Sequence, residues 1–285
     1  MQQFVRTRIA PTPSGYLHLG NVLSFALTAA LARQSGARIM LRIDDLDRQR
    51  VRTAYVKDIF DTLTYLSIPW DEGPTDYAAY ASTYSQVHRL ELYHRALAQL
   101  RAQGAVFACD CSRSVLQGNH PAGVYTGRCK YRGLPLDGKG YCWRIDTDNI
   151  DLPQHMHYFI ARKKDGMPAY QLASVVDDRH FGVDLIVRGN DLRDSTMAQR
   201  FLANVMGYAQ FDGASFVHHA LLKTSAGEKL SKSAGATSVY YLRGNGYSST
   251  DIYHMVGEMA GLPQPISTWA DLEPLIPVFA LPIEP

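Results

Sequence analysis

The segment RIAPTPSGYLHLGN, residues 8–21, most constrains what this 285-residue chain folds into. It joins an alternating, strand-like stretch at 4–10 to a stretch at 22–31 whose apolar residues have helical spacing. Small and stiff residues, glycines and prolines, fill the connection. A second strand-like run follows at 37–43, and an amphipathic helical pattern follows at 54–68, which Pro69 is expected to end. This order predicts an α/β domain with a doubly wound, largely parallel Rossmann-like sheet.

Composition and charge exclude several classes of protein. Hydrophobic residues make up 46% of the chain, enough for a substantial core. The formal net charge is +2, from 29 basic and 27 acidic residues, so only a clustered basic face would indicate a nucleic-acid partner. The sequence has no run of about 18 apolar residues and no signal peptide. We therefore expect a soluble cytoplasmic protein with no membrane partner.

The chain changes character in its middle, where residues 106–170 hold cysteines, glycines and short extended pieces. This region is expected to be an insertion between the two halves of the Rossmann-like domain, 1–105 and 171–235. Two modest helical patterns follow, so residues 236–285 are predicted to form a short helical C-terminal region.

Two segments have residue types that suit a nucleotide. A helix N-terminus favours anions, so the loop with Gly15, His18 and Gly20 before a helix suits phosphate. The segment GEKLSKS carries Lys229 and Lys232 among small residues, and such a loop can close over a triphosphate. An ordinary strand–helix turn and a solvated lysine pair are the alternatives.

The cysteines indicate a metal site in the insertion. Cys109, Cys111 and Cys129 have the close spacing that suits zinc, which takes four ligands. General zinc chemistry offers His120 as the fourth ligand, and three buried free cysteines are the alternative. Cys142 lies in a strand pattern and is expected in the core.

Several motifs resemble one enzyme family. HLGN is similar to the HIGH motif, and KLSKS to the KMSKS motif, of class I aminoacyl-tRNA synthetases. RIAPTPSGYLHLGN, LRIDDLDR, PAYQLASVVDD and LIVRGNDL resemble, in this order, the glutamyl branch of that class. The resemblance spans residues 6–235 and implies that the Rossmann-like domain is catalytic.

The resemblance implies a pocket for L-glutamate. Arginine binds a carboxylate with two parallel hydrogen bonds, and Arg8 and Arg188 correspond to the arginines of the glutamyl branch. Both lie in apolar segments, where an arginine without a ligand is unusual. The pocket implied by the resemblance comprises Arg8, Ala10, Thr12, Asp44, Tyr170 and Arg188, with Asp44 and Tyr170 on the α-ammonium group.

The resemblance also implies how ATP is bound, together with Mg²⁺. The residues that contact it are His18, Gly20, Asn21 and Lys232. His18, Lys229 and Lys232 are the catalytic residues, and they act by alignment and charge neutralisation rather than as nucleophile or base. In the insertion, the resemblance implies a structural zinc ion on Cys109, Cys111, Tyr125 and Cys129, which makes Tyr125 the rival of His120.

The acceptor is also inferred from resemblance. The chain ends about 50 residues after KLSKS, so we expect no separate anticodon-binding domain. This build and the Cys-Cys-Tyr-Cys pattern resemble glutamyl-queuosine tRNA(Asp) synthetases, which implies transfer of glutamate to queuosine in the anticodon of tRNA(Asp). A truncated glutamyl-tRNA synthetase that charges the 3′ end of tRNA(Glu), and a noncatalytic tRNA-binding paralogue, are the alternatives.

Three basic runs could contact tRNA phosphates or be solvated faces. They comprise Arg48, Arg50 and Arg52; Arg128, Lys130 and Arg132; and Arg162, Lys163 and Lys164.

Overall fold

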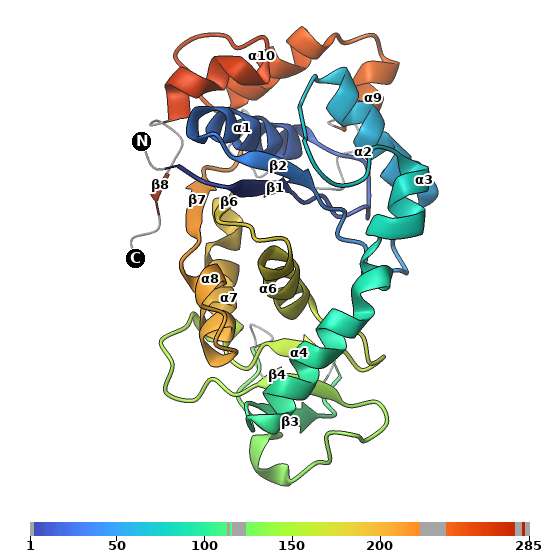
Figure 1. Ribbon diagram of the computed structural model, residues 1–285, viewed down its shortest axis with the longest axis vertical. Helices are drawn as coiled ribbons and strands as arrows, with labels where there is room; N and C mark the ends of the chain where they lie inside the picture. The colour runs from blue at the N-terminus through green and yellow to red at the C-terminus, as the bar shows by residue number, and fades with distance from the viewer. Residues whose placement is uncertain (1–2, 113–114, 116–123, 223–237, 277–280, 283–285) are drawn as a thin grey trace. The chain divides into compact units, whose positions relative to one another are not determined.

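The computed structural model describes residues 3–112, 115, 124–222, 238–276 and 281–282. The chain divides into two compact units (Figure 1). The first unit comprises residues 1–88, 182–191 and 214–285, and the second comprises 89–181 and 192–213.

The first unit is built on a five-stranded sheet, which confirms the predicted Rossmann-like α/β fold. Its strands, in spatial order, are β2 (Arg38–Leu41), β1 (Arg6–Ile9), β6 (Leu185–Gly189), β7 (Ser215–His219) and β8 (Leu281–Pro282). The first four strands run parallel, while β8 pairs antiparallel with β7 and was not predicted.

Helix α1 (Leu19–Ser35) follows β1 and packs on the sheet (Figure 1). It ends where the sequence predicts, because Gly36 adopts the left-handed conformation with φ 74° and its N–H bonds the Ala32 carbonyl. Successive strand side chains point to opposite faces of a sheet. Ile9, Leu185 and Val187 share the core with α1, so they lie on the face of the sheet that packs against this helix.

Further helical segments of the first unit accompany α1 and the sheet. They include α2 (Thr53–Tyr65), α9 (Val239–Gly244), α10 (Ser249–Met259) and the 3₁₀ segment η7 (Trp269–Leu275). α2 ends before Pro69, so the expectation that this proline ends it is wrong. The chain already turns at Ser67, which has a positive φ of 53°. α9 was not predicted, since six residues are too few to show a helical period.

A short irregular stretch follows α2 within the first unit. It comprises α3 (Tyr77–Ala79) and the π-helical η1 (Tyr80–Tyr84), and then the 3₁₀ turn η2 (Gln86–Arg89) leads into α4.

The second unit combines helices with a three-stranded antiparallel sheet in the order β3-β4-β5. Its main elements are α4 (Leu90–Ala102), β3 (Val106–Cys109), β4 (Cys142–Ile145), β5 (Ile160–Arg162), α6 (Tyr170–His180), α7 (Arg193–Val205) and α8 (Ala209–Asp212). The expected domain limits at 105/106 and 170/171 fall inside this unit. Within the described ranges, each helix is too short or too polar to cross a lipid bilayer.

A buried ion pair joins two helices of the second unit. Arg89, just before α4, donates to both carboxylate oxygens of Asp177 on α6, at 3.0 and 3.1 Å. The hydroxyl of Tyr93 donates to the same carboxylate at 2.7 Å, and all three side chains are buried. Removing one member leaves a buried charge without its counterpart, which is far more costly than losing an exposed pair.

Replacing Asp177 therefore destabilises the second unit. We expect Asp177→Ala to lower the free energy of unfolding by about 3–5 kcal/mol in urea titrations. Asp137→Ala, which breaks the exposed two-bond pair with Arg101, is the matched control and should change it much less. Equal losses of unfolding free energy in Asp177→Ala and Asp137→Ala would contradict the conclusion that burial makes the first ion pair more important for stability.

Candidate functional site

The two predicted glutamate-binding arginines lie on neighbouring strands of one sheet. Arg8 is on β1 and Arg188 on β6, with exposed fractions of 7% and 4%. Both alternate with residues that face α1, so both side chains point to the opposite face. The Arg8 guanidinium donates to the Val187 carbonyl at 3.2 Å, and that of Arg188 lies 5.1 Å from the Phe216 ring centre. The fold thus buries two guanidinium groups on one side of adjacent strands.

Asp44 lies beside the segment that follows β1. Its N–H donates to the Pro11 carbonyl at 2.9 Å, which brings it next to the predicted Ala10 and Thr12. Arg42, which sequence reasoning missed, donates to both oxygens of the Asp44 carboxylate, at 2.7 and 3.0 Å. The sequence could have indicated a role for Arg42, since it stands in the apolar run LRI just as Arg8 stands in RIA. Asp44 is therefore a carboxylate held in place by a buried cation.

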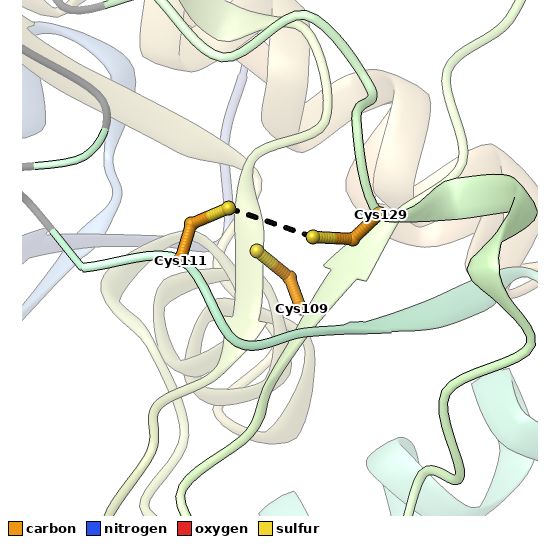
Figure 2. Close-up of side chains that lie close together, drawn as sticks. All are labelled: Cys109, Cys111 and Cys129. Carbon is orange, nitrogen blue, oxygen red and sulfur yellow. Dashed lines mark hydrogen bonds between the residues drawn. The ribbon is translucent and has the colours of Figure 1, made fainter. Parts of the chain in front are cut away.

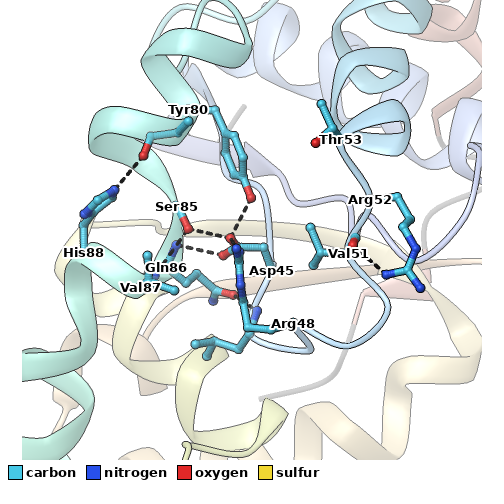
Figure 3. Close-up of polar contacts among 12 residues, drawn as sticks. Asp45, Arg48, Val51, Arg52, Thr53, Tyr80, Ser85, Gln86, Val87 and His88 are labelled. Atoms are coloured by element: carbon cyan, nitrogen blue, oxygen red, sulfur yellow. Dashed lines mark hydrogen bonds and ion pairs between the residues drawn. The ribbon is translucent and has the colours of Figure 1, made fainter.

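The next residue, Asp45, is the centre of a buried polar network (Figure 3). Its carboxylate accepts hydrogen bonds from the Tyr80 hydroxyl at 2.6 Å, the Ser85 hydroxyl at 2.5 Å and the Gln86 N–H at 2.8 Å. Arg48 adds an ion pair at 2.5 Å. These contacts tie the turn after β2 to the segment at residues 80–86, which fixes the backbone that carries Asp44.

His18 caps the N-terminus of α1, and this contact decides which of its ring nitrogens accepts a hydrogen bond and which one donates. Its Nδ1 accepts from the Gly20 N–H at 3.1 Å, so a neutral ring carries its proton on Nε2 and donates from there. Asn21 completes a capping box, because its Oδ1 accepts from the His18 N–H at 3.0 Å. A Cβ at Gly20 would lie 3.0 Å from the His18 ring, so glycine leaves room for the imidazole.

Three further predicted residues are Tyr170, Lys229 and Lys232. Tyr170 is the first residue of α6 in the second unit, where its side chain is 47% exposed. Lys229 and Lys232 lie outside the described residues.

The three predicted cysteine ligands converge in the second unit (Figure 2). The sulfur atoms of Cys109, Cys111 and Cys129 all lie within 4.8 Å of one another, and those of Cys111 and Cys129 are 3.5 Å apart. Sulfur ligands at about 2.3 Å from one tetrahedral zinc ion would be about 3.8 Å apart. The cluster therefore fits three of the four ligands of such an ion.

Tyr125 supplies a hydroxyl beside this cluster. The hydroxyl oxygen accepts from the Cys129 N–H at 2.8 Å, and the buried ring lies under the Arg144 guanidinium at 3.8 Å. Burial, together with the nearby Cys129 and Cys109 thiols, raises the pKa of the phenol. The rival ligand, His120, lies outside the described residues.

Cys142 is buried as expected, and it also supports the cluster. It pairs with Cys109 across the antiparallel strands β4 and β3, and its thiol donates to the Cys109 carbonyl at 3.4 Å. A hydrogen bond from Cys142 and the nearby Arg144 lower the pKa of the Cys109 thiol, while burial raises the pKa of Cys111. Cys109 is thus the first of these thiols to ionise, and the thiolate is the metal-binding form.

Most of the basic residues considered for tRNA phosphates have partners within the protein. Each of the following faces an acidic side chain: Arg48 with Asp45, Arg50 with Asp47, Lys130 with Asp146 and Asp148, Arg132 with Asp110, and Lys163 with Asp165. Arg162 stacks 5.0 Å over Trp143 instead. Arg52 and Lys164 donate to backbone carbonyls instead, Arg52 to those of Gln49 and Val51 and Lys164 to that of Asp110.

Comparison with known sequences places these residues in a family context. The family described as tRNA synthetases class I (E and Q), catalytic domain, matches residues 4–131 and 144–268. The chain is 37% identical to a protein from Symbiobacterium thermophilum named glutamyl-Q tRNA(Asp) synthetase, over 96% of this chain and 92% of that one. It is 33% identical to glutamate–tRNA ligase 2 of Syntrophus aciditrophicus, over 85% of this chain and 54% of that one.

A solved structure shares the fold. The glutamate–tRNA synthetase from Elizabethkingia anophelis aligns with a TM-score of 0.71 and 23% sequence identity. The alignment covers 89% of this chain and 61% of that one, so the chain spans about three fifths of this structural relative.

Proposed function

We propose that this chain, which belongs to the family of class I tRNA synthetases (E and Q), activates L-glutamate with ATP and transfers it to queuosine in the anticodon of tRNA(Asp). The observation that carries the proposal is the 37% identity, over 96% of the chain, to a relative named for that reaction. The geometry of the first unit supports it, because two buried arginines face one side of the sheet and Asp44 bonds the segment that follows β1.

The amino acid is recognised by charge on both of its ends. Arg8 and Arg188, both buried, bind the side-chain carboxylate through charge-assisted hydrogen bonds from their planar guanidinium groups. Asp44, with Tyr170, accepts from the α-ammonium group, and Ala10 and Thr12 line the pocket. Because Arg42 already donates to both oxygens of Asp44, the carboxylate is oriented before glutamate arrives.

Activation proceeds by alignment of two bound substrates. An oxygen of the α-carboxylate attacks the α-phosphorus of ATP, the bond to the bridging oxygen breaks, and pyrophosphate leaves. His18 donates from Nε2 to a phosphate, beside Gly20 and Asn21 at the N-terminus of α1. Lys229 and Lys232 bind the triphosphate, and Mg²⁺ on the phosphates adds neutralising charge.

Transfer then releases AMP. A hydroxyl of the cyclopentene ring of queuosine attacks the acyl carbon of glutamyl-adenylate, and an ester replaces the anhydride. No covalent enzyme intermediate is needed, so positioning of the anticodon nucleoside decides the rate.

The cysteine cluster holds a structural zinc ion in this proposal. Cys109, Cys111, Cys129 and Tyr125 are the ligands, and the ion stabilises a region with little regular structure. None of its ligands belongs to the glutamate or ATP sites.

The acceptor is tested by aminoacylation with labelled glutamate. We expect label on tRNA(Asp) that carries queuosine, none on tRNA(Asp) without it, and none on tRNA(Glu). Nuclease mapping should locate the label in the anticodon loop. Label only at the 3′ end of tRNA(Glu) would identify a glutamyl-tRNA synthetase, and no glutamate-dependent pyrophosphate exchange would identify a noncatalytic paralogue.

Arg188 is predicted to act on glutamate affinity. Arg188→Met keeps an unbranched side chain against Phe216 but removes the charge, so KM for glutamate should rise at least ~10-fold with little change in kcat. Pyrophosphate exchange at varied glutamate measures both constants. Arg6→Met, which alters an arginine of the neighbouring strand β1 that pairs with Glu72, is the control and should leave KM unchanged. An unchanged KM in Arg188→Met would remove this residue from the pocket.

The metal proposal predicts a difference between two cysteines of one strand pair. Cys109→Ser should lose most of the zinc measured by elemental analysis, because a hydroxyl is a poor ligand at neutral pH. Cys142→Ser alters the facing residue outside the three-sulfur cluster and should keep about one equivalent. Full zinc occupancy in Cys109→Ser would refute the site.

A further inference from the structure

Two tyrosines stack beside the loop that leads into α1. The rings of Tyr16 and Tyr240 lie 4.1 Å apart at an angle of 9°, and the edge of Tyr55 meets Tyr16 at 5.0 Å and 82°. Parallel stacking leaves the outer face of the last ring available for a further aromatic plane. Tyr240 is 49% exposed, as expected for a ring covered on one face only.

The backbone holds this stack in place. The Val239 N–H donates to the Leu17 carbonyl at 2.8 Å, and His18 forms a bridge with Ser238. Ser238 also caps α9, where its hydroxyl accepts from the Tyr241 N–H at 3.2 Å. A surface that is already ordered loses little conformational entropy on binding, so the stack is ready to accept a ligand.

The stack ends in an exposed aromatic ring. Tyr240 is one of the eight large apolar side chains that are exposed in the described part of the chain. Unpaired RNA bases bind proteins by stacking on aromatic rings, and each such base contributes appreciably to affinity.

A cation lies one helical turn from Tyr55, whose ring contacts Tyr16. Arg52 caps α2 one helical turn before Tyr55, whose N–H donates to the Arg52 carbonyl at 3.0 Å. Its guanidinium points away from the Asp45 network (Figure 3) and bonds only backbone carbonyls among the described residues. Arg48 and Arg50 have acidic partners, so Arg52 is the arginine of this run whose positive charge stays available for a phosphate.

We propose that Tyr16, Tyr240 and Arg52 form a docking surface for an unpaired nucleotide of RNA, with its base on Tyr240 and a phosphate on Arg52. The proposal rests on the proposed function only for which RNA is bound, a tRNA whose anticodon loop enters the site. The stack begins two residues before His18, so a nucleotide held there lies close to the proposed site of activation.

The surface is tested by the Kd of the full chain for tRNA(Asp), measured by filter binding with no ATP or glutamate. Tyr240→Ala should weaken binding about 5-fold or more, the scale of one lost base stack. Tyr240→Leu, which stays apolar but lacks a π face, should weaken it similarly, whereas Tyr240→Phe should bind as the wild type does. Tyr241→Ala is the matched control, because it alters the next residue of α9, which is 48% exposed, and should leave Kd unchanged.

The charge is tested separately. Arg52→Gln should reduce the slope of log K against log salt by about 0.7, the value for one phosphate contact with a single strand. Wild-type Kd in Tyr240→Ala and Tyr240→Leu would overturn the surface, and so would equal losses in Tyr241→Ala. Glutamate transfer is a separate readout. Absent transfer with these binding effects intact would reject the proposed function but keep the surface.

Discussion

Side chains that alternate across the parallel strands β1 and β6 are the constraint on which this structure depends. Because Ile9, Leu185 and Val187 face α1, Arg8 and Arg188 are directed to the opposite face and buried there. On the proposed assignment, these two guanidinium groups bind the side-chain carboxylate of the amino acid. The position of the proposed pocket thus follows from the pairing of the strands.

The same physics fixes the segments at the ends of the strands. Arg42 with Asp44, and Asp45 with its hydroxyl, amide and guanidinium donors, are buried charges with nearly complete sets of partners. Such networks tolerate little displacement, because each partner lost leaves an uncompensated group in a low dielectric. Exposed pairs such as Arg50 with Asp47 bring no comparable rigidity. The turn after β2 is thus ordered by burial of charge.

The sequence pattern predicted those elements that depend on interactions between residues close together in the chain. The periodicity around residues 4–36 predicted β1, α1 and the stop at Gly36, because strand alternation, helical spacing and a left-handed glycine all act over a few residues. The Asp45 network could not be predicted, since its partners Tyr80, Ser85 and Gln86 come from a distant segment. The facing of Cys142 and Cys109 required the strand register, and β8 is too short to show alternation. Arg8 and Arg188 were predicted from the resemblance, and their positions in apolar runs agree with their burial. That their strands are neighbours required the sheet order.

The stiffness of residues 8–21 has a functional reason on the proposed assignments. Within this one segment, Arg8 addresses the amino acid, His18 the triphosphate and Tyr16 the RNA, while Pro11 and Pro13 are buried between them. A reaction without an enzyme nucleophile depends on alignment, and a displacement of about 1 Å can cost about 100-fold in rate. A flexible connection would let three substrates move independently. Proline restricts the backbone between the contacts, glycine leaves room for His18, and the capping box fixes the end of the segment on α1.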